Sequence, residues 1–490
     1  MAIRFIPNDP RAGSVASAGR IQAKRPNRLA SRSGFVFTDP SPEGVAAPGT
    51  AQFLFWQMRE AAIAALQAWE ASAGPHKLWQ GKHSRLPIFQ NAGVDLNAYY
   101  DRASVSFFGQ TVAGAEFFSA ASTDVVAHEV GHGLLDSIRP DFFDVSYLEV
   151  GALHEAFGDC MALLTALNDL ETRRQLLAAV PGLGKRNFVE ATAEDLSRGI
   201  GLLIPGHNAA LPRRAFNSHQ YQLPSSLPSD GRPGVLINEV HSFGMVFSGC
   251  FWDLITNLFE ASSRKTEATL LDAARLAGKI LIAGLQSAVI TPRFFQAVGR
   301  AMTLADQALH DGANHLPIRA AFARHNLQLG SNSLLAPSMA LAGAAPSGAR
   351  LTAATRKDLL QRFGNARGAK LALSEHDLFG TPVVNVVQTR AVALGTVDRR
   401  LKGVVALVHE PVLIGDSGGR AAVIGNMPHS ADTNSEVYSF VGSLLARRRI
   451  DFGAVGKSSG QHRHATHSVR IQGGQRVLKR RRFSCFCHPV

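Results

Sequence analysis

Cysteine is scarce in this 490-residue sequence, which has four cysteines, at positions 160, 250, 485 and 487. So few and so unevenly spaced cysteines exclude the disulfide framework of a small secreted domain and leave the redox compartment open. Long apolar runs are also missing, since no stretch approaches the ~20 residues that span a bilayer. No transmembrane segment is therefore expected.

Acidic residues are almost absent from the two ends of the chain. Residues 1–33 hold seven Lys/Arg and one acid, and residues 452–490 hold eight Lys/Arg and no acid. The remaining body has 36 basic and 37 acidic residues, so the net charge of +13 belongs to the ends. We interpret residues 1–49 and 452–490 as solvated, disordered segments. Nucleic acid is not an expected partner, because no aromatic residues interleave with the basic ones and no known module is present.

A secretory signal is also missing from the start of the sequence. Met1 to Pro7 has neither an apolar core region nor a small-residue cleavage site. We therefore expect a protein that stays in the cytoplasm or is exported by a non-standard route. The length allows two to four domains with ample core.

The most informative stretch is His128-Glu129-Val130-Gly131-His132. Two histidines four positions apart lie on one face of a helix, one turn from each other, and can bind one metal ion. Glu129 can then point at a water on that metal. The flanking residues favour a helix. By itself, the pentapeptide also fits a buried helix with two hydrogen-bonded histidines.

A second predicted helix carries Glu155 and Asp159, again four positions apart on one face. A catalytic zinc takes three protein ligands and keeps one open position. Glu155 fits as the third ligand beside His128 and His132. Asp159 fits as the carboxylate that holds the ring N–H of a liganding histidine. The two helices together predict one zinc site.

The two helices read D-V-V-A-H-E-V-G-H from Asp124 to His132 and G-A-L-H-E-A-F-G-D from Gly151 to Asp159. Two further stretches accompany them: Asn97 to Tyr100 reads N-A-Y-Y, and Glu239 to Gly244 reads E-V-H-S-F-G. With a looser match at Arg214 to Asn217, these stretches resemble the thermolysin-like gluzincin metallopeptidases over about residues 50–327. The resemblance implies a zinc-dependent endopeptidase acting on peptides or proteins.

The resemblance assigns a role to each matching residue. It implies zinc ligation by His128, His132 and Glu155, with Glu129 as general base and Asp159 behind a ligand. His241 would stabilise the transition state, with help from Tyr147, while Asn97, Ala98 and Arg214 would bind substrate. The Asn97-Ala98 pair also fits a turn at a strand end. The family's aspartate five residues before His241 is Leu236 here, and Glu239 is the candidate that orients the ring instead.

Calcium is the second metal that the resemblance raises. Asp124 matches a family calcium position and Glu194-Asp195 matches part of another, but Ala193 and Ala166 replace family residues there. A full double-calcium site is therefore not expected. We interpret Glu194-Asp195 as a solvated helix start.

The expected fold class is α+β, and the resemblance implies two lobes of thermolysin type with the active-site helix between them. We expect a β-rich N-terminal lobe at 50–145 and a helical lobe at 146–327. A linker with a short helix would follow at 328–379, then a small β-rich module at 380–451. Helices are predicted at 50–73, 254–260, 267–285, 291–309 and 316–326.

The alternative function is a catalytically weak or inactive gluzincin scaffold that binds partners through its C-terminal module and basic tails. It predicts metal binding without turnover. The presence of Glu129 argues against it, because a scaffold has no need of a general base. The sequence leaves the oligomeric state open.

Overall fold

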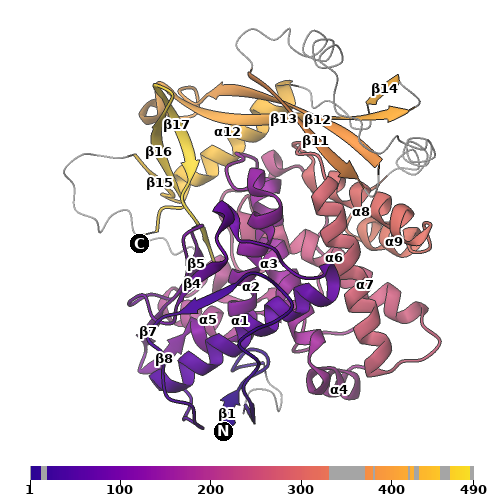
Figure 1. Cartoon of the computed structure of the whole chain (residues 1–490). Helices are drawn as coiled ribbons and strands as arrows, with labels where there is room; N and C mark the ends of the chain where they lie inside the picture. Colours follow the sequence, from indigo (N-terminus) through magenta and orange to yellow (C-terminus); the bar gives the residue numbers. More distant parts are fainter. Residues whose placement is uncertain are drawn as a thin grey trace.

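The computed structural model describes residues 2–12, 19–329, 370–378, 381–417, 420–423, 430–452 and 464–485. These residues form a mixture of helices and strands, as the α+β class predicts (Figure 1). Most of the predicted linker at 328–379 lies outside the described residues.

The helices account for most of the central part of the chain. Their bounds are α1 Ala51–Ala73, α2 Thr123–Ile138, α3 Leu148–Asn168, α4 Leu170–Ala179, α5 Glu194–Leu203, α6 Val240–Ala261, α7 Glu267–Ser287, α8 Phe294–His310, α9 His315–Arg324 and α12 Ser430–Ala446. All five helices predicted from periodicity are confirmed. The one predicted at 254–260 is longer than expected, because α6 already begins at Val240 and so includes His241 in its first turn.

The strands form two larger sheets and three two-stranded pairs. Their bounds are β1 Ala2–Phe5, β2 Arg20–Ala23, β3 Gly34–Phe37, β4 Arg85–Phe89, β5 Ala98–Tyr100, β6 Val105–Phe107, β7 Gly109–Val112, β8 Ala115–Phe118, β9 Ala191–Thr192, β10 Arg213–Arg214, β11 Lys370–Leu378, β12 Thr381–Ala393, β13 Val404–Ser417, β14 Arg420–Val423, β15 Ile450–Asp451, β16 His467–Gln472, β17 Gln475–Arg480 and β18 Phe483–Ser484. One sheet has the order β18-β5-β6-β4-β3. The other has seven strands, of which β11-β12-β13-β17-β16-β15 follow one path.

The helix that carries the two histidines has clear local start and stop signals. Ser122 caps α2, since its side chain accepts a hydrogen bond from the Val125 N–H. A proline disfavours helical backbone in the residue before it. Pro140 therefore excludes Arg139 from the helix, and α2 ends at Ile138. The sequence itself therefore fixes the length of α2.

Helix α3 packs against α2 and also against α6 in the centre of the molecule. A Cβ on Gly131 of α2 would lie 3.2 Å from Cα of Gly158 on α3, so the two backbones cross closely. Gly244 plays the same part on α6, where a Cβ would lie 2.9 Å from the Ala152 carbonyl oxygen. Glycines therefore let all three helices bring their polar side chains to one point.

Helix α3, Leu148–Asn168, is mostly apolar, although it also carries Glu149, His154, Glu155 and Asp159. Among the described helices, it alone is long and apolar enough to cross a membrane by composition. Its apolar window is completely buried inside the protein, as in a core helix of a folded domain.

The first 49 residues differ from the predicted disordered segment. Strands β1 and β2 form a hairpin, and β3 joins the sheet of β5. Ile3 and Phe5 are buried in the core. Three arginines of this segment pair with acids of the body: Arg11 with Asp195, Arg20 with Asp169 at 2.6 Å, and Arg25 with Glu60. The low apolar content of this segment favoured the prediction of disorder. A few buried apolar residues and ion pairs with other segments are nevertheless sufficient to fold it.

The described residues 464–485 of the C-terminal segment also differ from the predicted disordered tail. Strands β16 and β17 form a hairpin that continues the sheet of the expected β-rich module. Lys479 pairs with Asp144 at 3.1 Å, and Arg481 pairs with Asp451 at 3.2 Å. Two of the basic residues of this segment are thus paired with acids inside the fold.

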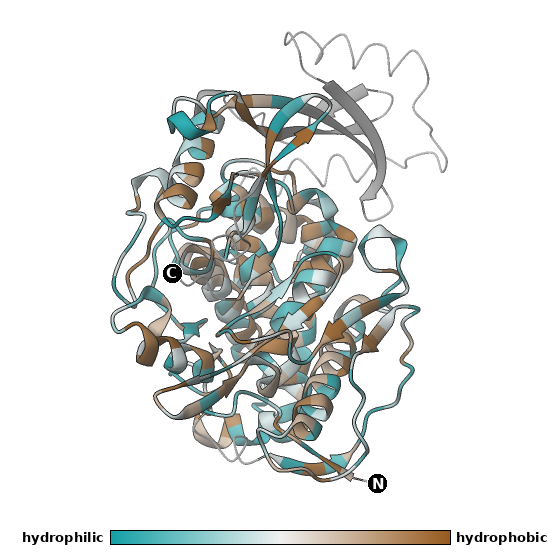
Figure 2. Cartoon of the chain, turned by 90° about the vertical axis from the view of Figure 1, so that its left-hand side faces the viewer, coloured by the Kyte–Doolittle hydropathy of each residue, from teal (hydrophilic) through white to brown (hydrophobic). Residues whose placement is uncertain are grey.

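The C-terminal sheet lies above the helical part of the molecule, at the opposite end from the N-terminus (Figures 1 and 2). Beyond β17, the chain leaves this sheet and reaches β5, where it adds β18 to the edge of the other sheet. The last described residues are thereby brought to the part of the molecule that contains α2.

Candidate metal centre

The two histidines of α2 and the glutamate of α3 converge on one point. Oε2 of Glu155 lies 3.1 Å from Nε2 of His128 and 3.5 Å from Nε2 of His132. All three side chains are buried. Two histidines one turn apart on α2 thus face a glutamate on α3, and the three side chains are those of the predicted ligand set.

The spacing of the three donor atoms fits a zinc ion. Tetrahedral ligands stand about 3.3 Å apart when zinc–nitrogen and zinc–oxygen bonds are about 2.0 Å long. The two measured distances from Oε2 of Glu155 lie on either side of that value. His128, His132 and Glu155 therefore suit zinc in both chemistry and spacing, with a fourth position left over.

Asp159 and Arg213 hold the first ligand histidine from behind. Nδ1 of His128 donates to Oδ1 of Asp159 at 2.9 Å, as the i, i+4 spacing from Glu155 predicts. Arg213, at the start of β10, donates to the same carboxylate at 2.9 Å. Burial alone would raise the pKa of Asp159, but Arg213 and His128 outweigh it and lower that pKa to about 2. Asp159 is therefore a carboxylate that fixes the ring of His128.

The second ligand histidine is held by a residue that sequence reasoning missed. Nδ1 of His132 lies 2.9 Å from Nδ1 of His154, within hydrogen-bond distance. Burial lowers the pKa of His154 well below its usual range and that of His132 to about 4, so both rings are neutral. His154 directly precedes the predicted ligand Glu155 in the sequence, and this closeness is the signal that could have pointed to it.

Glu129 faces the metal position without a protein partner. Both of its carboxylate oxygens are buried, and neither has a hydrogen-bond partner among the described residues. Burial raises the pKa of Glu129 to about 8, with the charge of His128 acting in the opposite direction. A buried acid kept free of hydrogen bonds and poised near neutrality has the properties of a general base.

His241 lies next to Glu155 of the ligand set. Its Nε2 stands 3.1 Å from Oε2 of Glu155, and its Nδ1 donates to Oε1 of Glu239 at 2.7 Å. Burial by itself lowers the pKa of His241, but Glu155 and Glu239 outweigh burial and raise it well above its usual range. Glu239 thus contacts the ring where Leu236 leaves the family's aspartate missing.

The remaining predicted site residues are placed as follows. Tyr147 is buried directly before α3, two turns ahead of Glu155. Arg214 pairs with Glu190 and lines a cavity of about 520 Å³ beside His241. Its neighbour Arg213, which sequence reasoning missed, is the arginine that reaches the ligand set. The role of Tyr147 stays a prediction.

Asn97 and Ala98 lie where a chain pairs with the sheet edge, and in this structure that chain is the protein's own C-terminal segment. Phe483 and Ser484 of β18 pair antiparallel with β5. The Cys485 N–H donates to the Ala98 carbonyl at 2.8 Å, and the Ser484 hydroxyl donates to Oδ1 of Asn97 at 2.9 Å. No local pattern in the sequence predicts this contact.

A separate cluster of acids lies at the start of α5. Oxygens of Asp9, Asp124 and Glu194 all lie within 4.8 Å of one another, a donor set of the type that calcium prefers. Burial raises the pKa of Glu194 to about 8 and that of Asp124 to about 6. Glu194 does begin a helix, as predicted, but it faces this cluster rather than solvent. Asp9 was missed, because it lies in the segment expected to be disordered.

Comparisons with known proteins agree with this geometry. Residues 101–332 match the fungalysin metallopeptidase (M36) family. Extracellular metalloproteinase 10 of Coccidioides posadasii is 28% identical over 218 residues, which cover 42% of this chain and 30% of that protein. Extracellular metalloproteinase 3 is 27% identical over 218 residues in Trichophyton tonsurans and 26% over 217 in Arthroderma otae.

The match covers only part of each protein, since the aligned residues make up 30% of the length of these three relatives. The family match over residues 101–332 includes α2, α3 and α6 with every predicted metal ligand, and it ends before the C-terminal sheet. The resemblance to the thermolysin-like gluzincin metallopeptidases is thereby confirmed, with residues 101–332 matching the fungalysin metallopeptidase family.

Proposed function

We propose that this chain is a zinc-dependent endopeptidase whose general base is Glu129. The observation that carries the proposal is the position of the Glu129 carboxylate, buried and without a hydrogen-bond partner, beside three donors spaced for one zinc ion. The two-lobed, thermolysin-like arrangement and the domain boundaries predicted from the sequence are part of the same proposal.

His128, His132 and Glu155 would hold a zinc ion, which would supply Lewis acidity toward a water and a peptide carbonyl. Glu129 accepts the proton of the attacking water and passes it to the leaving amine. His241, held by Glu239, donates a hydrogen bond to the carbonyl oxygen as negative charge develops there. Asp159 and His154 keep the two ligand rings in place.

The substrate backbone would lie along β5, where an extended chain can add as a strand. Asn97 and Ala98 supply hydrogen-bonding groups at that edge, and Arg213 can donate to a backbone carbonyl of the bound chain. Arg214 and the cavity of about 520 Å³ lie next to His241, in position to receive a side chain of the substrate. The relatives are named extracellular, and we extend that location to this chain as a proposal, with its route of export open.

The binding-scaffold alternative is favoured by one observation, the pairing of β18 with β5. The test compares cleavage of a random peptide pool by the parent chain, Glu129→Gln, Cys485→Ser and the double variant, all loaded with zinc. Cuts that depend on Glu129 support the peptidase, with a loss of about 10²–10⁴-fold in Glu129→Gln. One zinc bound per chain with no cuts by any of the four proteins supports the scaffold.

A further inference from the structure

The last described strand occupies the edge of the sheet that a peptide substrate would need. Without β18, the sheet order begins at β5, whose backbone groups would be open for pairing. Strand addition at such an edge is a common way for proteins to bind extended peptides. The segment Phe483 to Cys485 therefore binds as a substrate would, an inference that rests on the proposed function.

Phe483 anchors this segment on two histidines, the predicted ligand His132 and its neighbour His154. Its ring stacks on His154 at 3.8 Å between centroids and on His132 at 4.9 Å. The guanidinium of Arg480 covers the ring at 4.2 Å. Phe483 is 1% exposed, so the whole ring is removed from water. A buried aromatic anchor of this type supplies much of the binding energy of a docked segment.

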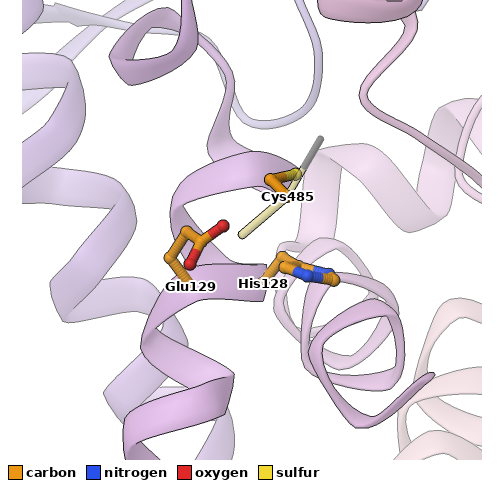
Figure 3. A group of neighbouring side chains, drawn as sticks. All are labelled: His128, Glu129 and Cys485. Carbon is orange, nitrogen blue, oxygen red and sulfur yellow. The ribbon is translucent and has the colours of Figure 1, made fainter. Parts of the chain in front are cut away.

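Cys485 is then held beside the metal position, next to His128 and Glu129. Its sulfur, a nitrogen of His128 and an oxygen of Glu129 all lie within 4.8 Å of one another (Figure 3). Its backbone is fixed on both sides, by the bond to Ala98 and by a hydrogen bond from Arg213 to its carbonyl at 3.3 Å. Cysteine sulfur is a preferred zinc ligand.

The setting of Cys485 differs from that of the other two described cysteines. Cys160 and Cys250 lie inside the long core helices α3 and α6. Cys485 lies in an extended segment and lines the cavity beside His241. Its sulfur also lies 3.9 Å from Nη2 of Arg213, the guanidinium behind His128.

We propose that Phe483–Cys485 is an intramolecular inhibitor in which β18 takes the place of the substrate on β5 and the Cys485 sulfur is the fourth ligand of the zinc ion. The chain is latent in this state. Activity begins when the segment leaves β5 and water replaces the sulfur, a ligand exchange that changes no oxidation state. The family match ends at residue 332, so this device belongs to the part of the chain outside the match.

A spectroscopic experiment tests the ligand without relying on turnover. The full-length chain is loaded with Co²⁺ in place of zinc, and the near-ultraviolet sulfur-to-cobalt charge-transfer band is recorded. We expect the band in the parent and in Cys487→Ser, the matched control in the same segment, and no band in Cys485→Ser. A parent spectrum without the band, or a band that survives in Cys485→Ser, overturns the ligand assignment.

Peptide cleavage by the zinc-loaded proteins tests the inhibition. We expect kcat/KM of Cys485→Ser to exceed that of the parent at least tenfold, with Cys487→Ser equal to the parent. Phe483→Ala should also raise kcat/KM and weaken the cobalt band, because it removes the anchor and keeps the sulfur. Equal cleavage by the parent, Cys485→Ser and Phe483→Ala overturns the inhibition. A cobalt band with no cleavage by any variant refutes the peptidase function and leaves the Cys485 ligand supported.

Discussion

Gly158 of α3 lies directly against the ring of His128 on α2. A Cβ at position 158 would stand 2.5 Å from Nδ1 and 2.6 Å from Cε1 of that ring, closer than real Cβ contacts occur. The missing side chain is what lets α3 approach α2 until Glu155 and Asp159 both reach His128. The ligand set therefore depends on this helix crossing as well as on the ligands themselves.

The first prediction concerns that crossing. Gly158→Ala should displace the His128 ring and lower the affinity for zinc at least tenfold, with a loss of about 1–3 kcal/mol in the free energy of unfolding from overpacking. Zinc titration against a competing chelator and thermal unfolding measure the two effects. The control is Gly442→Ala in α12, where a Cβ meets nothing within 4 Å. That control should be neutral or stabilising by up to ~1 kcal/mol. Parent-like zinc affinity in Gly158→Ala would contradict the argument.

A second prediction concerns the carboxylate behind His128. Asp159→Asn keeps the shape of the side chain and removes the negative charge to which Arg213 and His128 both donate hydrogen bonds. Zinc affinity should fall about 10–100-fold, as for other residues that orient a metal ligand. Asp141→Asn is the matched control, because Asp141 is a 42% exposed carboxylate paired with Arg139. Competitive zinc titration of both variants decides the matter, and equal affinities would exclude a positioning role for Asp159.

The pH dependence of activity tests the pair formed by His241 and Glu239. Glu239 raises the pKa of His241, so Glu239→Gln should lower that pKa, and the protonated donor is then lost at a lower pH. The alkaline limb of kcat/KM should move by about one pH unit toward acid, equivalent to ~1.4 kcal/mol. The profile is best recorded in the Cys485→Ser background, with Glu171→Gln as the exposed control. An unchanged alkaline limb would show that Glu239 does not set the state of His241.

Stability should depend on pH through the acid cluster of Asp9, Asp124 and Glu194. The folded pKa of Glu194, about 8, lies above its ordinary value of 4.5, so the folded state holds a proton that the unfolded state has lost. The resulting stability is present at low pH and disappears as pH rises toward 8. In chelator at pH 8, Glu194→Gln should therefore be more stable than the parent, by on the order of 1–2 kcal/mol. The difference should shrink toward pH 5.

Calcium provides the second arm of that experiment. A divalent cation replaces the protons in compensating three close carboxylates, so Ca²⁺ should raise the Tm of the parent at pH 8 and have less effect on Glu194→Gln. Thermal unfolding with and without Ca²⁺ measures both. If Ca²⁺ leaves the parent unchanged while zinc stays bound, the cluster is a proton-binding site only.

The chemistry of the metal centre could be predicted from local spacing. His128 and His132 stand one turn apart whatever the rest of the fold does, and the same holds for Glu155 and Asp159. The cap at Ser122 and the stop before Pro140 are also local. Because a helix turns residues i and i+4 to one face without outside help, the sequence determined both halves of the zinc site.

Which residues meet across long separations could not be read in the same way. Arg213 and Arg214 are neighbours, and the two-residue strand β10 turns only Arg213 toward Asp159. Asp9 joins Asp124 and Glu194 because the N-terminal hairpin docks on the body. No local period marks such residues, so sequence reasoning favoured the wrong surroundings for the segment that contains Asp9.

The two ends of the chain show the division most clearly. Their low apolar content and high positive charge are local properties, and both favour a disordered interpretation. Only the tertiary structure decided that acids of the body compensate this charge and that the open edge of β5 receives β18. The sequence by itself determined the set of proposed metal ligands. The packing of helices and the pairing of strands far apart in the chain decided which side chains stand behind those residues and that Cys485 lies beside His128 and Glu129.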